Sequence, residues 1–222
     1  MKKDYRFYLT LITLIICFGC SNKDNFESQT TIHDSLKTYF SSANDFNLPK
    51  KERLAYTKKA LSIVSEQEND SIGRVNLFKV ANRFYNIGEF NDYSHTVRVI
   101  LQQSAKVMDT TSMAKAYNYL GDYYDSQSKI DSAFQFYYKA EKLYNEKGDK
   151  INLGRTLISK SSLLFRSGDF LASEQSVIKA LRAVNDEKSA GNIRFEANNV
   201  LSLIHHELGD YETAILYNKK AL

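Results

Sequence analysis

The sequence predicts an all-α fold, a solenoid of stacked helix–turn–helix units with a period of about 40 residues. A first series of fragments recurs at this period: Lys59-Ala60-Leu61, Lys139-Ala140-Glu141, Lys179-Ala180-Leu181 and Lys220-Ala221-Leu222. With Ile100 in the remaining place, the spacings of this series are 40, 40, 40 and 41 residues. A second series runs in step about a dozen residues earlier: Gly88-Glu89-Phe90, Ser128-Lys129-Ile130, Gly168-Asp169-Phe170 and Gly209-Asp210-Tyr211. The single proline, Pro49, leaves long helices possible elsewhere.

The composition is that of a globular protein without a nucleic-acid surface. Apolar residues make up 43% of the 222 residues and charged residues 25%, which argues against disorder throughout. The formal net charge is +4, and the charges are interspersed along the chain. Because binding to nucleic acid requires a dense basic patch that neutralises phosphates, we expect no nucleic-acid binding by this segment.

Residues 1–19 are typical of a signal peptide. Lysines at the start precede an apolar stretch over residues 7–18, which is short for a membrane span of roughly 20 residues. Gly19-Cys20 resembles a bacterial lipobox, although Cys17 stands where that motif usually has Leu and Phe18 is bulky for its place. The resemblance implies lipidation of Cys20, with residues 20–33 as the lipidated Cys and a polar tether. An ordinary secretory signal or an uncleaved anchor is the alternative.

Each repeat has the pattern of two amphipathic helices joined by a tight turn. Around residues 116–124, apolar side chains recur at three- and four-residue spacing, which predicts a helix with one apolar face. The glycine at the turn can adopt a left-handed conformation that ends this helix, and the acidic residue after it favours the start of the next. Small residues such as Ala133 and Ala140, with Tyr137 between them, would let the two helices approach closely. A single hairpin cannot bury its apolar face, so the units must stack.

The best unit resembles the tetratricopeptide (TPR) repeat, because these residues fall at the spacing of that family's signature: Tyr117, Leu120, Gly121, Tyr124, Ala133, Tyr137 and Ala140. HEAT and armadillo repeats have similar periods, but this order favours TPR. The other units depart from the signature at Tyr93, Lys160 and His205, and the first keeps only its second-helix pattern. The resemblance implies a right-handed α-solenoid whose extra residues over 34 lengthen each second helix and loop. The expected units are approximately 34–73, 74–113, 114–153, 154–194 and 195–222, the last incomplete.

In the TPR family the first helices line a concave surface that holds a peptide or protein partner. Carried over residue by residue, the resemblance implies a candidate partner-binding face made of Lys79, Asn82, Tyr85, Asn86, Lys115, Asn118, Tyr119, Asp122, Asp125, Arg155, Ser162, Phe165, Arg166, Asn199, Leu203 and His206. Amides can bond a peptide backbone and aromatic rings can pack its side chains. The alternative for any one of them is a solvated face of stacked helices. Tyr119 stands where a carboxylate-clamp TPR needs Asn, so no such clamp is expected.

The sequence shows no pattern for catalysis, a metal or a cofactor. His205-His206-Glu207 is the densest titratable cluster, but adjacent side chains on a helix point about 100° apart and do not chelate together. We expect His205 to fill the site between helices and His206 to face the groove. Zinc-protease patterns, glycine-rich phosphate loops and paired-cysteine motifs are missing. The sequence therefore predicts a non-enzyme without cofactors.

Two functions remain open at this point. The first is an interaction scaffold that is lipid-anchored outside the cytoplasm, in the bacterial cell envelope, and faces the periplasm or the surface. The second is a sensor: the resemblance extends to bacterial regulators in which such repeats precede a membrane span and a helix-turn-helix or histidine-kinase output. The sequence stops at Leu222 inside an expected second helix, with no capping helix of the kind that ends a solenoid. We therefore expect a fragment of a longer protein.

Overall fold

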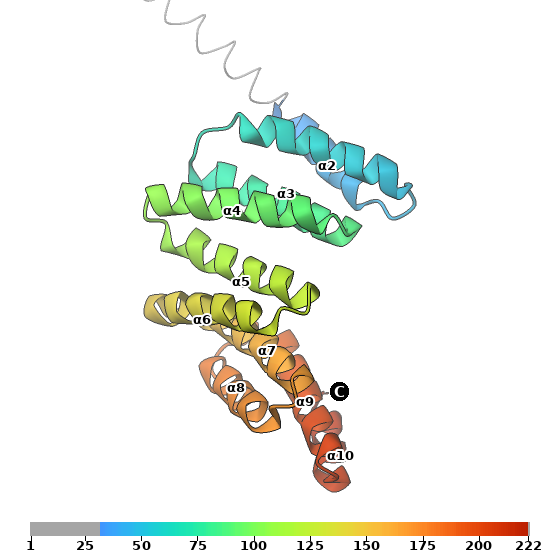
Figure 1. Ribbon diagram of the computed structural model, residues 1–222, viewed down its shortest axis with the longest axis vertical. Helices are drawn as coiled ribbons and strands as arrows, with labels where there is room; N and C mark the ends of the chain where they lie inside the picture. Colours follow the sequence, from blue (N-terminus) through green and yellow to red (C-terminus); the bar gives the residue numbers. More distant parts are fainter. Residues whose placement is uncertain (1–31, 222) are drawn as a thin grey trace, which may run out of the picture.

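The chain forms a stack of helical hairpins in the computed structural model, which describes residues 32–221. All regular structure in this range is helical. A helix over residues 32–44 precedes α2 (Lys50–Ser65), α3 (Ser71–Ile87), α4 (Phe90–Lys106), α5 (Thr110–Ser126), α6 (Ile130–Lys147), α7 (Lys150–Arg166), α8 (Phe170–Ala183), α9 (Gly191–Glu207) and α10 (Tyr211–Ala221). Figure 1 shows these helices following one another along the long axis, from α2 at one end to α10 at the other.

The five hairpins of residues 32–221 pair the helix over residues 32–44 with α2, α3 with α4, α5 with α6, α7 with α8, and α9 with α10. Consecutive hairpins contact each other through their first helices and across each connection. α5 packs on α7 and α7 on α9, while each second helix also packs on the first helix that follows it. The hairpins that begin with α3, α5, α7 and α9 start three to four residues ahead of the boundaries expected from the sequence. The additional residues are not confined to second helices and loops, because the first helices α3, α5, α7 and α9 each have 17 residues, while the second helices α4, α6 and α8 have 17, 18 and 14.

Aspartate side chains cap the starts of several helices, and residues in the left-handed conformation follow the ends of several helices. The side chains of Asp70, Asp109 and Asp149 each accept a hydrogen bond from a backbone N–H in the first turn of α3, α5 and α7. Between the two helices of a hairpin, glycine adopts a positive φ of 77–83° at residues 88, 168 and 209. Ser128 occupies the equivalent place in the third hairpin and is held at φ 55°.

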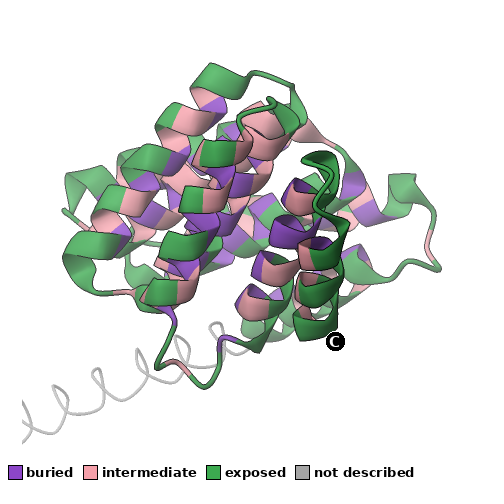
Figure 2. Cartoon of the chain, turned by 90° about the horizontal axis from the view of Figure 1, so that it is seen from below, coloured by how far each residue is buried: buried purple, intermediate pink, exposed green. Residues whose placement is uncertain are grey.

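The core lies between the two helices of each hairpin and between hairpins. The recurring series at Ala60, Ile100, Ala140 and Ala180 is fully buried, with 0% exposure at each position. In Figure 2 the buried residues lie on the helix faces turned toward neighbouring helices, and the outer faces are exposed. The repeat period therefore marks positions that pack between helices, as expected for stacked amphipathic hairpins.

Small residues let the two helices of a hairpin approach closely. The hydroxyls of Ser161 and Ser173 lie 3.1 Å apart between α7 and α8, where both residues are fully buried. In the preceding hairpin, a Cβ added to Gly121 would lie 2.5 Å from the ring of Tyr137. Tyr93 is the exception to this pattern: its ring is buried and its hydroxyl donates 2.8 Å to the backbone oxygen of Tyr119, so it links α4 to the next hairpin.

Polar contacts also join successive hairpins. Buried Arg74 at the start of α3 forms an ion pair of 3.0 Å with Asp109, which caps α5. The expected signal peptide, Cys20 and residues 20–31 of the tether lie outside the described residues. No helix of residues 32–221 has the length and apolar character needed to cross a bilayer.

Candidate partner-binding site

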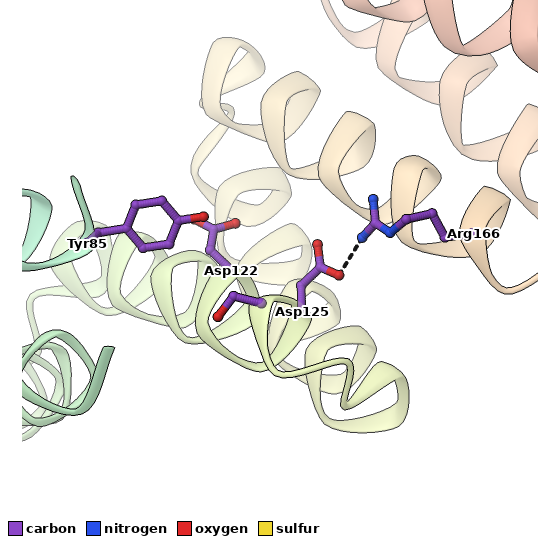
Figure 3. Close-up of a pocket in the computed structure, with 5 residues that line it drawn as sticks. Tyr85, Asp122, Asp125 and Arg166 are labelled. Carbon is purple, nitrogen blue, oxygen red and sulfur yellow. Dashed lines mark hydrogen bonds and ion pairs between the residues drawn. The ribbon is translucent and has the colours of Figure 1, made fainter. Parts of the chain in front are cut away.

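Three successive first helices line a polar pocket of about 280 Å³ that is open to solvent. Figure 3 shows Tyr85 of α3 directed toward Asp122 from one side, and Arg166 of α7 reaching Asp125 from the other. Asp122 and Asp125 lie three residues apart on α5, which places them on one face of that helix. Ser126, one residue further, completes the lining. The pocket therefore draws its side chains from three repeats.

Asp122 is the electrostatic centre of the pocket. Its carboxylate accepts a hydrogen bond of 2.8 Å from the hydroxyl of Tyr137, a residue in the core of the same hairpin. Burial raises the pKa of Asp122 to about 6, and the nearby charge of Asp125 acts in the same direction. The hydrogen bond from Tyr137 opposes this rise. Asp122 is therefore a carboxyl group that titrates close to neutral pH.

Contacts of Arg166 and Tyr85 fix the other sides of the pocket. Arg166 forms an ion pair with Asp125, and the side chains keep 52% and 26% of their exposure. Tyr85 packs edge-on against Tyr93 and Phe90 with ring centroids 5.2 and 5.6 Å apart. Burial raises the pKa of the Tyr85 hydroxyl, with further contributions from Asp122 and Asp125, so it stays a neutral donor. Two carboxylates against one guanidinium leave the lining with an excess of one negative charge when both acids are ionised.

Four of the residues expected on the concave face meet in this pocket: Tyr85, Asp122, Asp125 and Arg166. Three others on α5 are used between helices. The Lys115 ammonium lies 4.3 Å from the ring centre of Phe78, and burial lowers its pKa. Asn118 accepts a hydrogen bond of 2.8 Å from Thr156 of α7, and the half-buried Tyr119 ring packs edge-on against Phe78 at 5.2 Å. These three side chains therefore stabilise the packing of α5 against α3 and α7.

The remaining candidates are spread along the solenoid. Lys79 lines a separate pocket near the first hairpin, whereas Asn82 and Asn86 are exposed on α3. On α7, Arg155 is exposed and donates to Asn152, Ser162 is partly buried, and Phe165 packs against Phe170. The α9 positions do not line the polar pocket: Asn199, Leu203 and His206.

The two neighbouring histidines have different surroundings. The His205 side chain lies between α9 and α10, with its ring stacked on Tyr217 at 5.4 Å and its Nδ1 at 3.4 Å from Asp210. His206 keeps 64% of its side-chain exposure and packs edge-on against Tyr211. Within residues 32–221, no group of three or more His, Cys, Asp or Glu side chains is arranged to hold a metal ion.

Ser126 is a pocket residue that the sequence interpretation missed. It follows Asp122 by four residues and therefore lies on the same helix face one turn later. The helical period of α5 could have identified it. The TPR pattern did not, because Ser126 is the last residue of the helix, beyond the positions carried over.

Comparison with solved structures places the chain among helical-repeat proteins. BtubC from P. vanneervenii superposes with a TM-score of 0.65 at 14% identity, over 78% of this chain and 71% of that one. A kinesin light chain-like protein of Podosopora anserina with nearly identical TPR-like repeats superposes with a TM-score of 0.62 at 8% identity, over 84% and 92%. The fold is a TPR-like α-solenoid. RapI shares it, with a TM-score of 0.58 at 15% identity over 85% of this chain and 82% of that one. Neither protein-family models nor curated proteins give a match.

Proposed function

We propose that this TPR-like solenoid is a non-catalytic scaffold that holds a protein or peptide partner along α3, α5 and α7. The observation that carries the proposal is the polar pocket shared by these three helices, because a groove that spans several repeats can follow an extended chain. Beside the guanidinium of Arg166, its lining offers two carboxylates, a tyrosine hydroxyl and a serine hydroxyl, which are acceptors for a cationic group. The partner therefore inserts a lysine or arginine side chain between Tyr85 and Asp125.

Charge and desolvation explain why a basic side chain suits this pocket. Asp122 is destabilised as an anion by burial, and a cation beside it would relieve that cost. Asp125 already pairs with Arg166, but that pair is half exposed and contributes little, so Asp125 can share a second cation. Charge-assisted hydrogen bonds to carboxylates are about twice as strong as neutral ones, so this contact would dominate a peptide's affinity.

A positional peptide library tests this proposal. The full chain is immobilised and incubated with short peptides randomised at every position, and bound peptides are sequenced. We expect enrichment of Lys or Arg at one position, and loss of that enrichment in the Asp122→Asn/Asp125→Asn variant. The matched control is Glu207→Gln/Glu212→Gln, which removes two exposed carboxylates outside the pocket. No enrichment over bare support, or the same basic preference in the pocket variant, would reject the proposal.

The proposal includes attachment to a membrane of the bacterial cell envelope through a lipid on Cys20, facing the periplasm or the surface. It is supported by the apolar stretch at residues 7–18 followed by Gly19-Cys20. Because two acyl chains anchor a protein firmly where one does not, diacylation of Cys20 would suffice. Growth with radiolabelled palmitate tests it: label should persist in Cys17→Ser and disappear in Cys20→Ser. Label that remains on the Cys20→Ser chain would contradict the anchor.

A further inference from the structure

A groove of about 690 Å³ lies between the second helices of the third and fourth hairpins. α6 and α8 form its walls, and α7 forms its floor. Leu153 and Leu157 supply the apolar floor, while Tyr138 of α6 and Ala183 of α8 add apolar surface at the sides. Tyr138 is 56% exposed, so a large aromatic face is open to solvent at the edge of the groove. Such a surface can pack the apolar side chains of another molecule.

The rim of this groove is basic. Four cationic side chains line it, Lys142, Lys150, Lys179 and Arg182, against the single carboxylate of Glu141. Glu141 is already neutralised by Lys160 at 2.8 Å. Lys142 and Lys150 contact Glu146 and Glu187 at 3.9 and 3.6 Å, in exposed pairs that contribute little and can be exchanged.

Lys179 differs from the other lysines of its repeat series. Lys59, Lys139 and Lys220 each lie 5.0–5.4 Å from the centre of an aromatic ring three residues earlier on the same helix. At Lys179 the ring is replaced by Ser176, whose hydroxyl donates to the backbone of Leu157 in the floor. Within residues 32–221, neither Lys179 nor Arg182 forms an ion pair. Their charges are therefore available to a ligand in the groove.

The same surface continues one repeat further. A hollow of about 380 Å³ is lined by residues that each follow a residue of the groove by 40 positions: Ile178, Leu181, Arg182 and Asn185. Apolar Leu181 replaces Glu141 in this copy, and Arg182 lines both hollows. The apolar and basic surface therefore extends along α8 from one repeat to the next.

We infer that the groove between α6 and α8 is a second docking surface, which takes an acidic amphipathic segment of a partner protein. Leucine-like side chains of that segment pack on Leu153 and Tyr138, above the buried Leu157, and its Asp or Glu residues pair with Lys179 and Arg182. The occupant is argued from charge complementarity, because the rim has an excess of positive charge over an apolar floor. Exposed salt bridges alone would give little affinity, and the apolar floor supplies the area that charges on a flat surface lack.

This surface is separate from the pocket in the proposed function. α7 is the element shared by the two linings, and Leu157 and Arg166 are nine residues apart on it. At about 100° per residue, that separation places them on opposite sides of the helix. The solenoid can therefore hold one partner on each face, and failure of one site leaves the other testable.

Fluorescence anisotropy with a synthetic peptide tests the inference. The probe is a labelled peptide of about 16 residues with leucines at helical spacing flanked by glutamates, and the comparison peptide replaces every glutamate with lysine. We expect the full chain to bind the acidic probe and to show no binding of the basic peptide. Lys179→Glu/Arg182→Glu should weaken binding about tenfold or more, because attraction becomes repulsion at two positions. Asn145→Trp should also weaken it, by filling the groove without changing charge.

The control variant is Lys51→Glu/Lys58→Glu, which makes the same change in net charge at exposed positions of α2. It should keep the affinity of the wild-type chain, and all variants should keep the helical circular dichroism signal. Equal weakening in the control, or equal binding of both peptides, would overturn the inference. Two other results would also overturn it: binding of phosphatidylglycerol vesicles in place of the peptide with the same variant dependence, or a dimer in sedimentation that Lys179→Glu/Arg182→Glu dissociates.

Discussion

The hydroxyl of Tyr137 donates a hydrogen bond of 2.8 Å to Asp122, and so connects a core residue of α6 to the polar pocket on α5. The tyrosine is 1% exposed and its ring packs directly over Gly121. Its position is therefore set by close packing of the two helices. Because the ring cannot move, the orientation of the Asp122 carboxylate is set by the same packing.

Tyr137→Phe should separate the packing role of the ring from the role of the hydroxyl. Loss of the hydrogen bond should lower the free energy of unfolding by about 1–2 kcal/mol near neutral pH, where the acceptor is charged. The pKa of Asp122 should rise further, because this hydrogen bond lowers it in the wild-type protein. Chemical denaturation and an NMR titration of the Asp122 carboxyl carbon measure the two effects. The control is Tyr138→Phe, whose exposed ring should give neither change.

Stability should depend on pH through Asp122. Its pKa in the fold is about 6, above the ordinary value of 3.8, so folding disfavours its charged form. Its contribution to stability is therefore complete below about pH 3.8 and is lost as the pH rises through about 6. Asp122→Asn should remove this loss. The difference in unfolding free energy between the variant and the wild-type protein should therefore shift in favour of the variant by about 1–2 kcal/mol from pH 4 to pH 8, a value reduced because the residue keeps some contact with solvent. Thermal melts across this range measure the difference; a constant difference at every pH would contradict the assignment.

Arg74 and Asp109 should be coupled across the junction between the second and third hairpins. The Arg74 side chain is 6% exposed, and its guanidinium donates hydrogen bonds to Asp109 and, at 2.8 Å, to Asn69. Arg74→Ala should cost about 2–4 kcal/mol, because it removes the buried guanidinium and leaves the partly buried Asp109 carboxylate without its cation. Arg155→Ala, at an exposed position on α7, serves as the control and should cost less than about 0.5 kcal/mol.

A double-mutant cycle with Asp109→Asn isolates the pairwise part of this effect. Asparagine retains the ability to cap α5, so the cycle reports the ion pair rather than the cap. We expect a coupling energy of about 1–2 kcal/mol by urea denaturation. Additive losses would show that the junction is held by packing alone.

Ser128→Gly should stabilise the solenoid. Serine is held at φ 55° at the turn between α5 and α6, where three other hairpins have glycine. A side chain in the left-handed region costs roughly 1–2 kcal/mol, and the greater chain entropy of glycine offsets part of the gain. The net increase should be about 0.5–1 kcal/mol, seen as a higher denaturation midpoint with an unchanged slope. The reverse change, Gly168→Ser at φ 83°, should destabilise by a similar amount.

The sequence alone could predict the period, the helical hairpins and the buried small residues. These features are local, because a glycine ends each such turn in the same way and a small side chain permits each close helix contact. Glycine therefore recurs at residues 88, 168 and 209, with Ser128 as the exception, and buried alanine recurs at residues 60, 140 and 180. The sequence predicted the helix boundaries less well. The aspartate caps of α3, α5 and α7 lie outside the TPR signature, and they start each hairpin before the expected boundary.

The tertiary structure decided which residues of the inner face form a site. Asn118 and Lys115 share the face of α5 with Asp122, but Thr156 and Phe78 occupy them across the stack. The pocket needs side chains as far apart in sequence as Tyr85 and Arg166, and the pKa of Asp122 depends on how deeply the stack buries it. A repeat pattern determines which face a residue lies on. The neighbours it meets there, and the water it loses, depend on how each hairpin is rotated and packed against the next.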